Sequence, residues 1–163
     1  MIVEACRYNR WANLRLLDVC EGLTARQLEL TSPGTYGSIA STLVHLVGAE
    51  RRYLWRLGGQ VGRFSQHRTF PGVQTLKKQA VVSGSGLIEM ASGTKSPDIL
   101  ELRDRRGRFR VHKSVILVQA LHHGNDHRTH VCTILGAHHI AYPDMDVWTF
   151  GEATGKLVEL GKA

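Results

Sequence analysis

The sequence lacks any hydrophobic run that approaches the ~18 residues a membrane-spanning helix needs. Its first twenty residues contain no apolar core of a secretory signal, because they carry charges at Glu4, Arg7, Arg10, Arg15 and Asp18. It also lacks internal repeats and long linkers, and its 163 residues are a length typical of one domain. We therefore expect a single domain over residues 1–163 that works in the cytoplasm and has no membrane partner.

Cysteine is scarce as well. The three cysteines, Cys6, Cys20 and Cys132, are an odd number and form no C-x-x-C pair. In a chain without an export signal such residues are expected to be reduced thiols and not a disulfide framework. Stability must then come from a hydrophobic core, and a chain of this length with 42% hydrophobic residues can bury one.

Positive charge exceeds negative charge, with 21 Lys and Arg against 14 Asp and Glu, which gives a net charge of +7. Such an excess can mark a protein that binds nucleic acid. However, residues 103–110 alone contain five Arg and one Asp. A single arginine-rich turn is usually a solvated loop, so we expect no specific nucleic-acid partner. Collection of phosphates or of a carboxylate substrate is the alternative for this segment.

Four segments have the apolar spacing of amphipathic helices, residues 3–20, 38–57, 72–92 and 114–137. In the first, Tyr8 and Trp11 are expected in the core, with the wall of a cavity as the alternative, and Asn13 is expected outside the apolar face. Ser38 is the predicted N-cap of the second. The third is less regular, because Gly84 and Gly86 each disfavour a helix interior by about 1 kcal/mol.

Outside these four segments, the sequence predicts only short elements. Residues 99–103 and 108–112 alternate apolar and polar side chains on either side of Arg106-Gly107, which predicts a β-hairpin. A last helical turn is predicted near residues 150–161. Four long helices in one small domain favour an all-α four-helix bundle. Because the connection that holds the hairpin is long, a simple up-down-up-down order need not apply.

Histidine is abundant: six of the nine histidines lie within residues 122–139. His123 and His127 are four residues apart, so a helix places both rings on one face, where a pair can bind a metal ion. A third ligand should come from another helix, and His45 is the candidate. Small residues surround His45 three and four positions away, which leaves room in front of its imidazole: Ser41, Thr42, Gly48 and Ala49.

Each of these histidines also has a structural interpretation. A histidine on a mostly apolar helix, such as His45, is often a hydrogen-bonded core residue, and exposed i, i+4 pairs arise by chance. His130 shares a face with His127 and is either a partly exposed polar residue, a fourth ligand or a proton carrier. His122 points about a hundred degrees away from His123. The other histidines are expected to lie outside any site: His67, His112, His138 and His139.

The order and spacing of several motifs resemble the DinB/YfiT-like family over nearly the whole chain. The opening helix motif is matched by YNRWAN at residues 8–13, and the second helix by residues 36–53. The H-x-x-x-H helix is matched by LHHGNDHR at residues 121–128, and the closing segment by DMDVW at residues 144–148. The similarity is weakest over residues 60–112.

The resemblance implies a four-helix bundle with a long crossover and a single divalent metal ion, zinc or nickel, held by His45, His123 and His127. It also implies a homodimer, as many members form, and transfer of a low-molecular-weight thiol to an electrophile or isomerisation of a thiol adduct, as in some relatives. After His-Arg the family often has a small residue and then Gln, whereas this chain has Thr129-His130. This departure leaves the identity of the metal open.

Three neutral imidazoles with an open position are typical of a catalytic metal site, where a metal acts as a Lewis acid or lowers the pKa of a water or thiol. Arg52 or Arg128 at the mouth of the bundle would meet the carboxylates of an anionic thiol, and Glu50 and Asp126 are expected to pair with these arginines. The hypotheses are a metal-dependent enzyme acting on a small thiol, a non-enzymatic metal or small-ligand binding protein, and a basic nucleic-acid binder. No catalytic residue is assigned.

Overall fold

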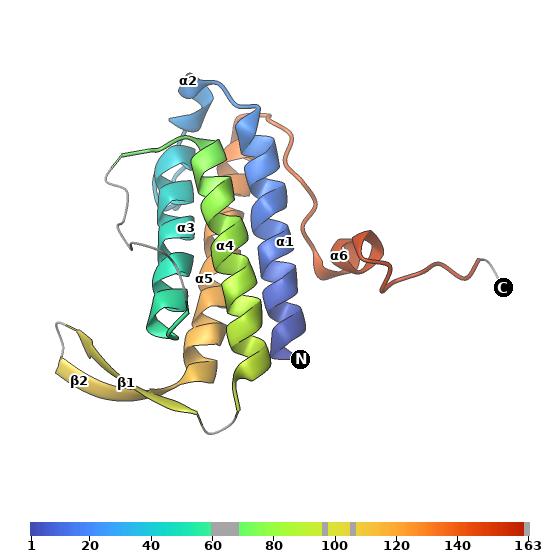
Figure 1. Ribbon diagram of the computed structural model, residues 1–163. Coiled ribbons are helices and arrows are strands. Elements are labelled where there is room, and N and C mark those ends of the chain that lie inside the picture. The colour runs from blue at the N-terminus through green and yellow to red at the C-terminus, as the bar shows by residue number, and fades with distance from the viewer. Residues whose placement is uncertain (60–68, 96–97, 105–106, 162–163) are drawn as a thin grey trace.

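The computed structural model describes residues 1–59, 69–95, 98–104 and 107–161. Four long helices lie side by side as a bundle, and a small hairpin projects from one end (Figure 1). The all-α class and the hairpin are as predicted. In chain order the elements are α1 (Ile2–Glu21), α2 (Ala25–Leu28), α3 (Ile39–Arg56), α4 (Val73–Gly93), β1 (Ile99–Asp104), β2 (Gly107–His112), α5 (Lys113–Ala137) and α6 (Val147–Ala153).

The helices do not follow an up-down-up-down order. In Figure 1, α1 and α5 run in one direction and α3 and α4 in the other. Both α1 and α3 pack against α4 and α5, whereas α4 and α5 touch each other little. The connection from α4 to α5 therefore joins opposite corners of the bundle, and the antiparallel hairpin lies within it. This arrangement makes α3 and α5 neighbours.

Local signals in the sequence explain where the helices begin and end. Ser38 caps α3 as predicted, because its hydroxyl accepts a hydrogen bond from the Ser41 N–H at 3.2 Å. The helical turn predicted over residues 150–161 is wrong in its bounds. The α6 helix begins earlier, where the Asp146 carboxylate accepts from the Thr149 N–H at 2.8 Å. It ends before Gly155, which has a φ of +68°.

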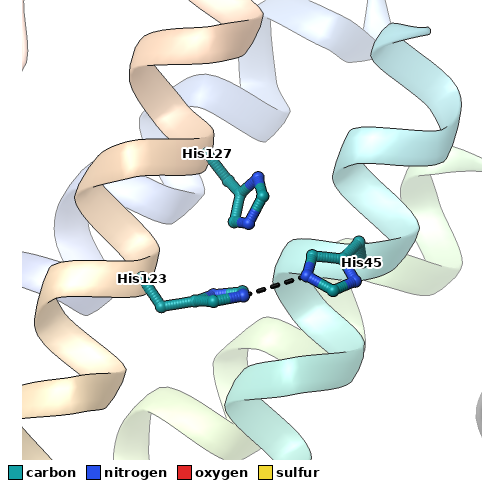
Figure 2. A group of neighbouring side chains, drawn as sticks. All are labelled: His45, His123 and His127. Atoms are coloured by element: carbon teal, nitrogen blue, oxygen red, sulfur yellow. Dashed lines mark hydrogen bonds between the residues drawn. The ribbon is translucent and has the colours of Figure 1, made fainter. Parts of the chain in front are cut away.

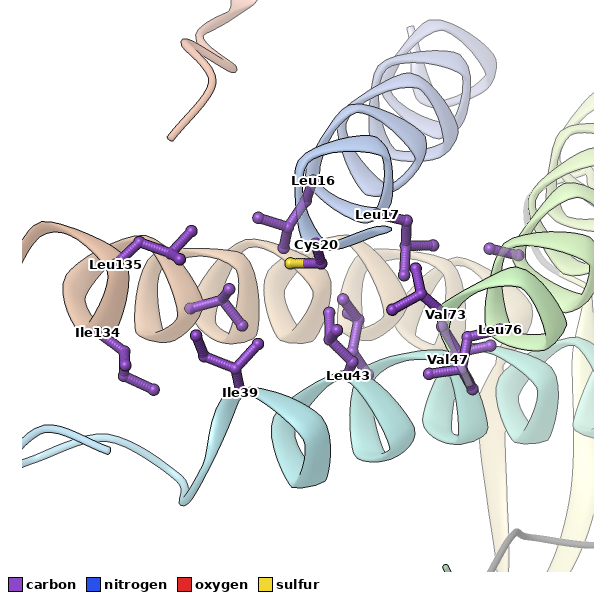
Figure 3. Close-up of a cluster of buried hydrophobic side chains, with 13 residues drawn as sticks. Leu16, Leu17, Cys20, Ile39, Leu43, Val47, Val73, Leu76, Ile134 and Leu135 are labelled. Carbon is purple, nitrogen blue, oxygen red and sulfur yellow. The ribbon is translucent and has the colours of Figure 1, made fainter. Parts of the chain in front are cut away.

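Two apolar clusters form the core. One lies toward the α2 end and joins all four long helices (Figure 3). The other lies toward the hairpin and is smaller. The fully buried side chains of the first cluster include Leu16, Leu17, Ile39, Leu43, Leu76, Ile134 and Leu135.

A layer of buried polar side chains separates these two clusters. The Glu50 carboxylate, 3% exposed, accepts hydrogen bonds from Nδ2 of Asn9 and Asn13 at 2.8 Å each, and from the Ser83 hydroxyl at 2.5 Å. From the other side, Arg128 Nη1 donates to the Oδ1 atoms of Asn9 at 2.7 Å and Asn13 at 2.6 Å. We call these five residues, one or two from each long helix, the polar layer.

The polar layer corrects two expectations. Asn13 is buried and not outside the apolar face of its helix. Glu50 and Arg128 do not bond directly, because the two asparagines lie between them. Asp126 Oδ2 lies 2.8 Å from Nδ1 of His122. Burial raises the pKa of Glu50, while the hydrogen bonds from Ser83 and the asparagines act in the opposite direction.

Gly124 allows α5 to approach this layer, and its substitution provides a test. A Cβ at Gly124 would lie against Asn9 Oδ1 and 2.9 Å from Arg128 Nη1. We expect Gly124→Ala to lower the free energy of unfolding by about 1–3 kcal/mol through overpacking, measured by urea denaturation. The matched control is Gly93→Ala at the end of α4, where a Cβ meets nothing within 4 Å and a gain of about 0.4–1 kcal/mol is expected. A Gly124→Ala protein as stable as the wild type would contradict this role.

Candidate metal centre

The packing of α3 against α5 brings together the three histidines that the sequence singles out. His45 comes from the middle of α3, and His123 and His127 come from successive turns of α5 (Figure 2). One ring nitrogen of each histidine lies within 4.8 Å of the others. The predicted triad therefore converges, and we refer to it as the histidine cluster.

The spacing of the nitrogens fits a shared ion. Nε2 of His45 and Nε2 of His123 are 3.0 Å apart. Two imidazole nitrogens each about 2.0–2.1 Å from one ion, at angles of about 90–109°, would be about 2.9–3.4 Å apart. The His127 ring lies over this pair, with centroids 4.7 Å from His45 and 4.3 Å from His123. The cluster can thus hold a divalent ion that accepts imidazole ligands.

Tyr36 fixes the orientation of His45. Its hydroxyl is 3.0 Å from His45 Nδ1, and the two rings stack with centroids 4.2 Å apart. The rings of Tyr36 and His127 also meet edge to face, with their centroids 5.0 Å apart. Because Nδ1 of His45 is engaged by the hydroxyl, Nε2 is the nitrogen left to face the cluster. Tyr36 lies at the start of the segment 36–53 that contains the second helix motif, and its position in the sequence predicts no role for it.

The imidazoles of the cluster favour the neutral form. Burial, reinforced by the neighbouring histidines, lowers the pKa of His123 to about 4. Burial also lowers the pKa of His127 to about 4, with His45 and His130 adding to the effect. The pKa of His45 is lowered as well, by burial and then by the positive charge of Arg52. Neutral rings keep the lone pairs that metal binding requires.

His130 lies next to the cluster but outside it. Its ring centroid is 5.3 Å from that of His127, and among the described residues the cluster comprises only the three predicted ligands. The Nδ1 atoms of His127 and His130 are buried and have no hydrogen-bond partner in the described part of the chain. A role for His130 as a fourth ligand therefore receives no support.

The remaining histidines are placed as expected where they are described. His122, His138 and His139 are exposed, and His138 Nε2 lies 3.0 Å from the carbonyl oxygen of Thr31. His112 precedes α5 at the end of the hairpin. His67 lies outside the described residues.

Three expectations about side chains around the site are corrected. Arg128 is 2% exposed and belongs to the polar layer, so it does not stand at the mouth of the bundle. Tyr8 and Trp11 are half-buried and pack against Phe150, with centroids 5.9 Å and 5.5 Å away. Tyr8 lines one surface cavity and Trp11 lines another, and neither side chain belongs to the core.

The cysteines are buried or half-buried free thiols, and two arginines of the hairpin are paired with a carboxylate. All three cysteines are free, and burial raises the pKa of Cys6 and Cys132 to about 11 and that of Cys20 to about 12. Their thiols stay protonated at neutral pH. On the hairpin, Glu101 pairs with Arg108 at 3.1 Å and with Arg110 at 3.2 Å. In the described part of the chain, no helix is long and apolar enough to cross a membrane.

Comparison with known proteins places the chain in a family and supports its fold. The model of the DinB family matches residues 1–148. The chain belongs to the DinB family. The crystal structure of a DinB-like protein from Bacillus cereus ATCC 10987 is similar, with a TM-score of 0.67 and 19% sequence identity, over 88% of this chain and 94% of that one. At this identity the likeness shows the DinB fold alone. No curated protein matches the chain.

The lowered histidine pKa values predict how the metal-free protein responds to acid. The unfolded chain, whose histidines titrate near pH 6.5, binds more protons than the folded chain between that pH and about 4. The stability that His123 and His127 contribute is therefore present above pH 6.5 and is lost as the pH falls toward 4. Thermal unfolding with a chelator present should show Tm falling over this window.

Variants separate this effect from other titrating groups. His123→Gln and His127→Gln should each flatten the dependence of Tm on pH, because glutamine takes up no proton. Exposed His112, the N-cap residue of the same helix, supplies the control, and His112→Gln should keep the wild-type slope. Glu50, whose raised pKa acts in the opposite direction, is present in every variant and cancels in the comparison. Equal slopes in all four proteins would show that burial does not hold these rings neutral.

Proposed function

We propose that this DinB-family chain binds one divalent metal ion, zinc or nickel, through His45, His123 and His127, and uses it to activate a low-molecular-weight thiol for transfer to an electrophile. The observation that carries the proposal is the convergence of three imidazoles from two helices, with two Nε2 atoms 3.0 Å apart. Family membership supports it.

The donor set determines what chemistry is available. A divalent ion held by three neutral imidazoles keeps an open position, and its Lewis acidity favours the deprotonated form of a water or thiol there. The chain supplies the rest. Tyr36 orients His45, burial keeps His123 and His127 neutral, and the protein's own thiols remain protonated. Arg52 brings positive charge near His45, which favours an anionic substrate.

Two alternatives use the same chain differently. A non-enzymatic metal or small-ligand binding protein needs the histidine cluster but no substrate. A nucleic-acid binder would use the arginines of the hairpin, and Glu101 weakens this alternative because it neutralises part of their charge. The homodimer implied by the resemblance remains a proposal, and sedimentation of the purified chain tests it.

Metal content tests the binding step. Protein purified without a histidine tag should contain about one zinc or nickel ion per chain, as measured by elemental mass spectrometry. His45→Ala, His123→Ala and His127→Ala should each remove most of this metal, because two imidazoles seldom hold a divalent ion. His122→Ala and His130→Ala should retain it. If the three cluster variants bind as much metal as the wild type, the proposed site is wrong.

Thiol transfer tests the catalytic step. Bacillithiol, mycothiol and glutathione are each mixed with chlorodinitrobenzene; the thiol sulfur bonds to the ring carbon, chloride leaves, and the thiol proton passes to solvent. The metal-loaded wild type should accelerate thioether formation with at least one thiol. Protein from which a chelator has removed the metal, and the His127→Ala variant, should not accelerate it. Metal binding without acceleration by any of the three thiols would favour the non-enzymatic alternative.

A further inference from the structure

A second cavity, of about 430 Å³, lies on the opposite side of α1 from the histidine cluster. It is bounded by α1, by Ile88 of α4, and by α6 and the residues after it. In Figure 1, α6 stands beside α1 on the side away from α3, where His45 resides. The volume falls within the roughly 300–1,000 Å³ range of small-molecule sites. Six of its lining residues carry a positive charge or an aromatic ring: Arg7, Arg10, Trp11, Arg15, Phe150 and Lys156.

The lining carries excess positive charge. Four cationic side chains face the cavity and only one carboxylate, Asp18, which pairs with Lys77 outside it. Arg7 and Lys156 both bind the single carboxylate of Glu4. No ion pair joins Arg10 or Arg15 to a carboxylate of the described residues. The cavity therefore attracts anions.

Packing against α4 holds the Arg10 side chain in place, and its Nε–H has no hydrogen-bond partner among the described residues. Its aliphatic stem lies on Gly84 of α4, where a Cβ would approach Arg10 Cγ to 2.7 Å. Its Nε atom is buried. Because Nε is enclosed by protein, an anion in the cavity would meet the outer part of the Arg10 guanidinium, whose charge no carboxylate of the described residues neutralises.

Aromatic rings form the apolar part of the wall. Trp11 and Phe150 have centroids 5.5 Å apart, and the Arg15 guanidinium lies over the Trp11 ring at 5.2 Å from its centroid. Planar guanidinium groups beside aromatic surface suit a ligand that is both flat and anionic. We propose that this cavity binds a small aromatic anion, in which a carboxylate, sulfonate or phosphate group meets Arg10 and Arg15 and the ring packs against Trp11 and Phe150.

Fluorescence titration of the full chain with anilinonaphthalene sulfonate tests the site. Arg10→Gln should weaken binding of this probe about tenfold or more, because a charge-assisted hydrogen bond is lost. Arg15→Gln should weaken it too, and because Arg15 is exposed this variant keeps the proposal testable if Arg10→Gln does not fold. Arg26→Gln, an exposed arginine on α2, loses the same charge elsewhere and should bind as the wild type does. Removal of bound metal with a chelator should leave the affinity for the probe unchanged, which separates this site from the candidate metal centre.

Competition identifies the source of the anion. Naphthoate or adenosine monophosphate should displace the probe, and inorganic phosphate at the same concentration should not. Displacement by naphthoate alone assigns the site to ring carboxylates or sulfonates, and displacement by the nucleotide alone assigns it to ring-bearing phosphates. The proposal is overturned if Arg10→Gln and Arg15→Gln both bind like Arg26→Gln. It is also overturned if inorganic phosphate displaces the probe as well as naphthoate does, since charge alone would then account for binding.

Discussion

The fold depends on how the bundle accommodates Arg128 and Glu50, two charged residues buried among its four helices. Removing such charges from water is unfavourable unless each finds partners of good geometry. Asn9 and Asn13 supply them in both directions, since each amide donates from Nδ2 to Glu50 and accepts at Oδ1 from Arg128. This geometry exists in one arrangement of α1, α3 and α5, so the polar layer selects that register over arrangements that would pack leucines equally well.

The same register assembles the histidine cluster. Arg128 directly follows His127 on α5, and Glu50 lies five residues after His45 on α3. When these two charges meet the asparagines, the adjoining parts of the two helices, about 100–140° around each axis, bring His45, His123 and His127 toward one another. A slide of α5 by one turn would separate the rings and would also leave Arg128 without acceptors. The histidine cluster and the polar layer are therefore fixed together.

Local sequence patterns predicted the helices and the histidines of the cluster but not the polar layer. Periodicity identified α3 and α5, and the i, i+4 spacing put His123 and His127 on one face. The helix order and the burial of Asn13 depend on which helices become neighbours, which periodicity does not encode. The signal was present in one respect: Asn9 and Asn13 are also four residues apart, and a repeated polar residue beside buried Ala12 and Leu16 indicates a buried polar contact.

The glycines inside the helices show how packing overrides intrinsic preference. By intrinsic helix propensity, Gly84 and Gly86 each destabilise the α4 helix by about 1 kcal/mol relative to alanine. In the bundle, however, Gly84 lies under the stem of Arg10, Gly86 lies against Leu54, and Gly124 faces Asn9 and Arg128. A methyl group at any of these positions would push α1 or α3 away from its neighbour. The close approach of the helices that places Asn9 inside the bundle and Arg10 at its surface thus rests on residues that a helix otherwise disfavours.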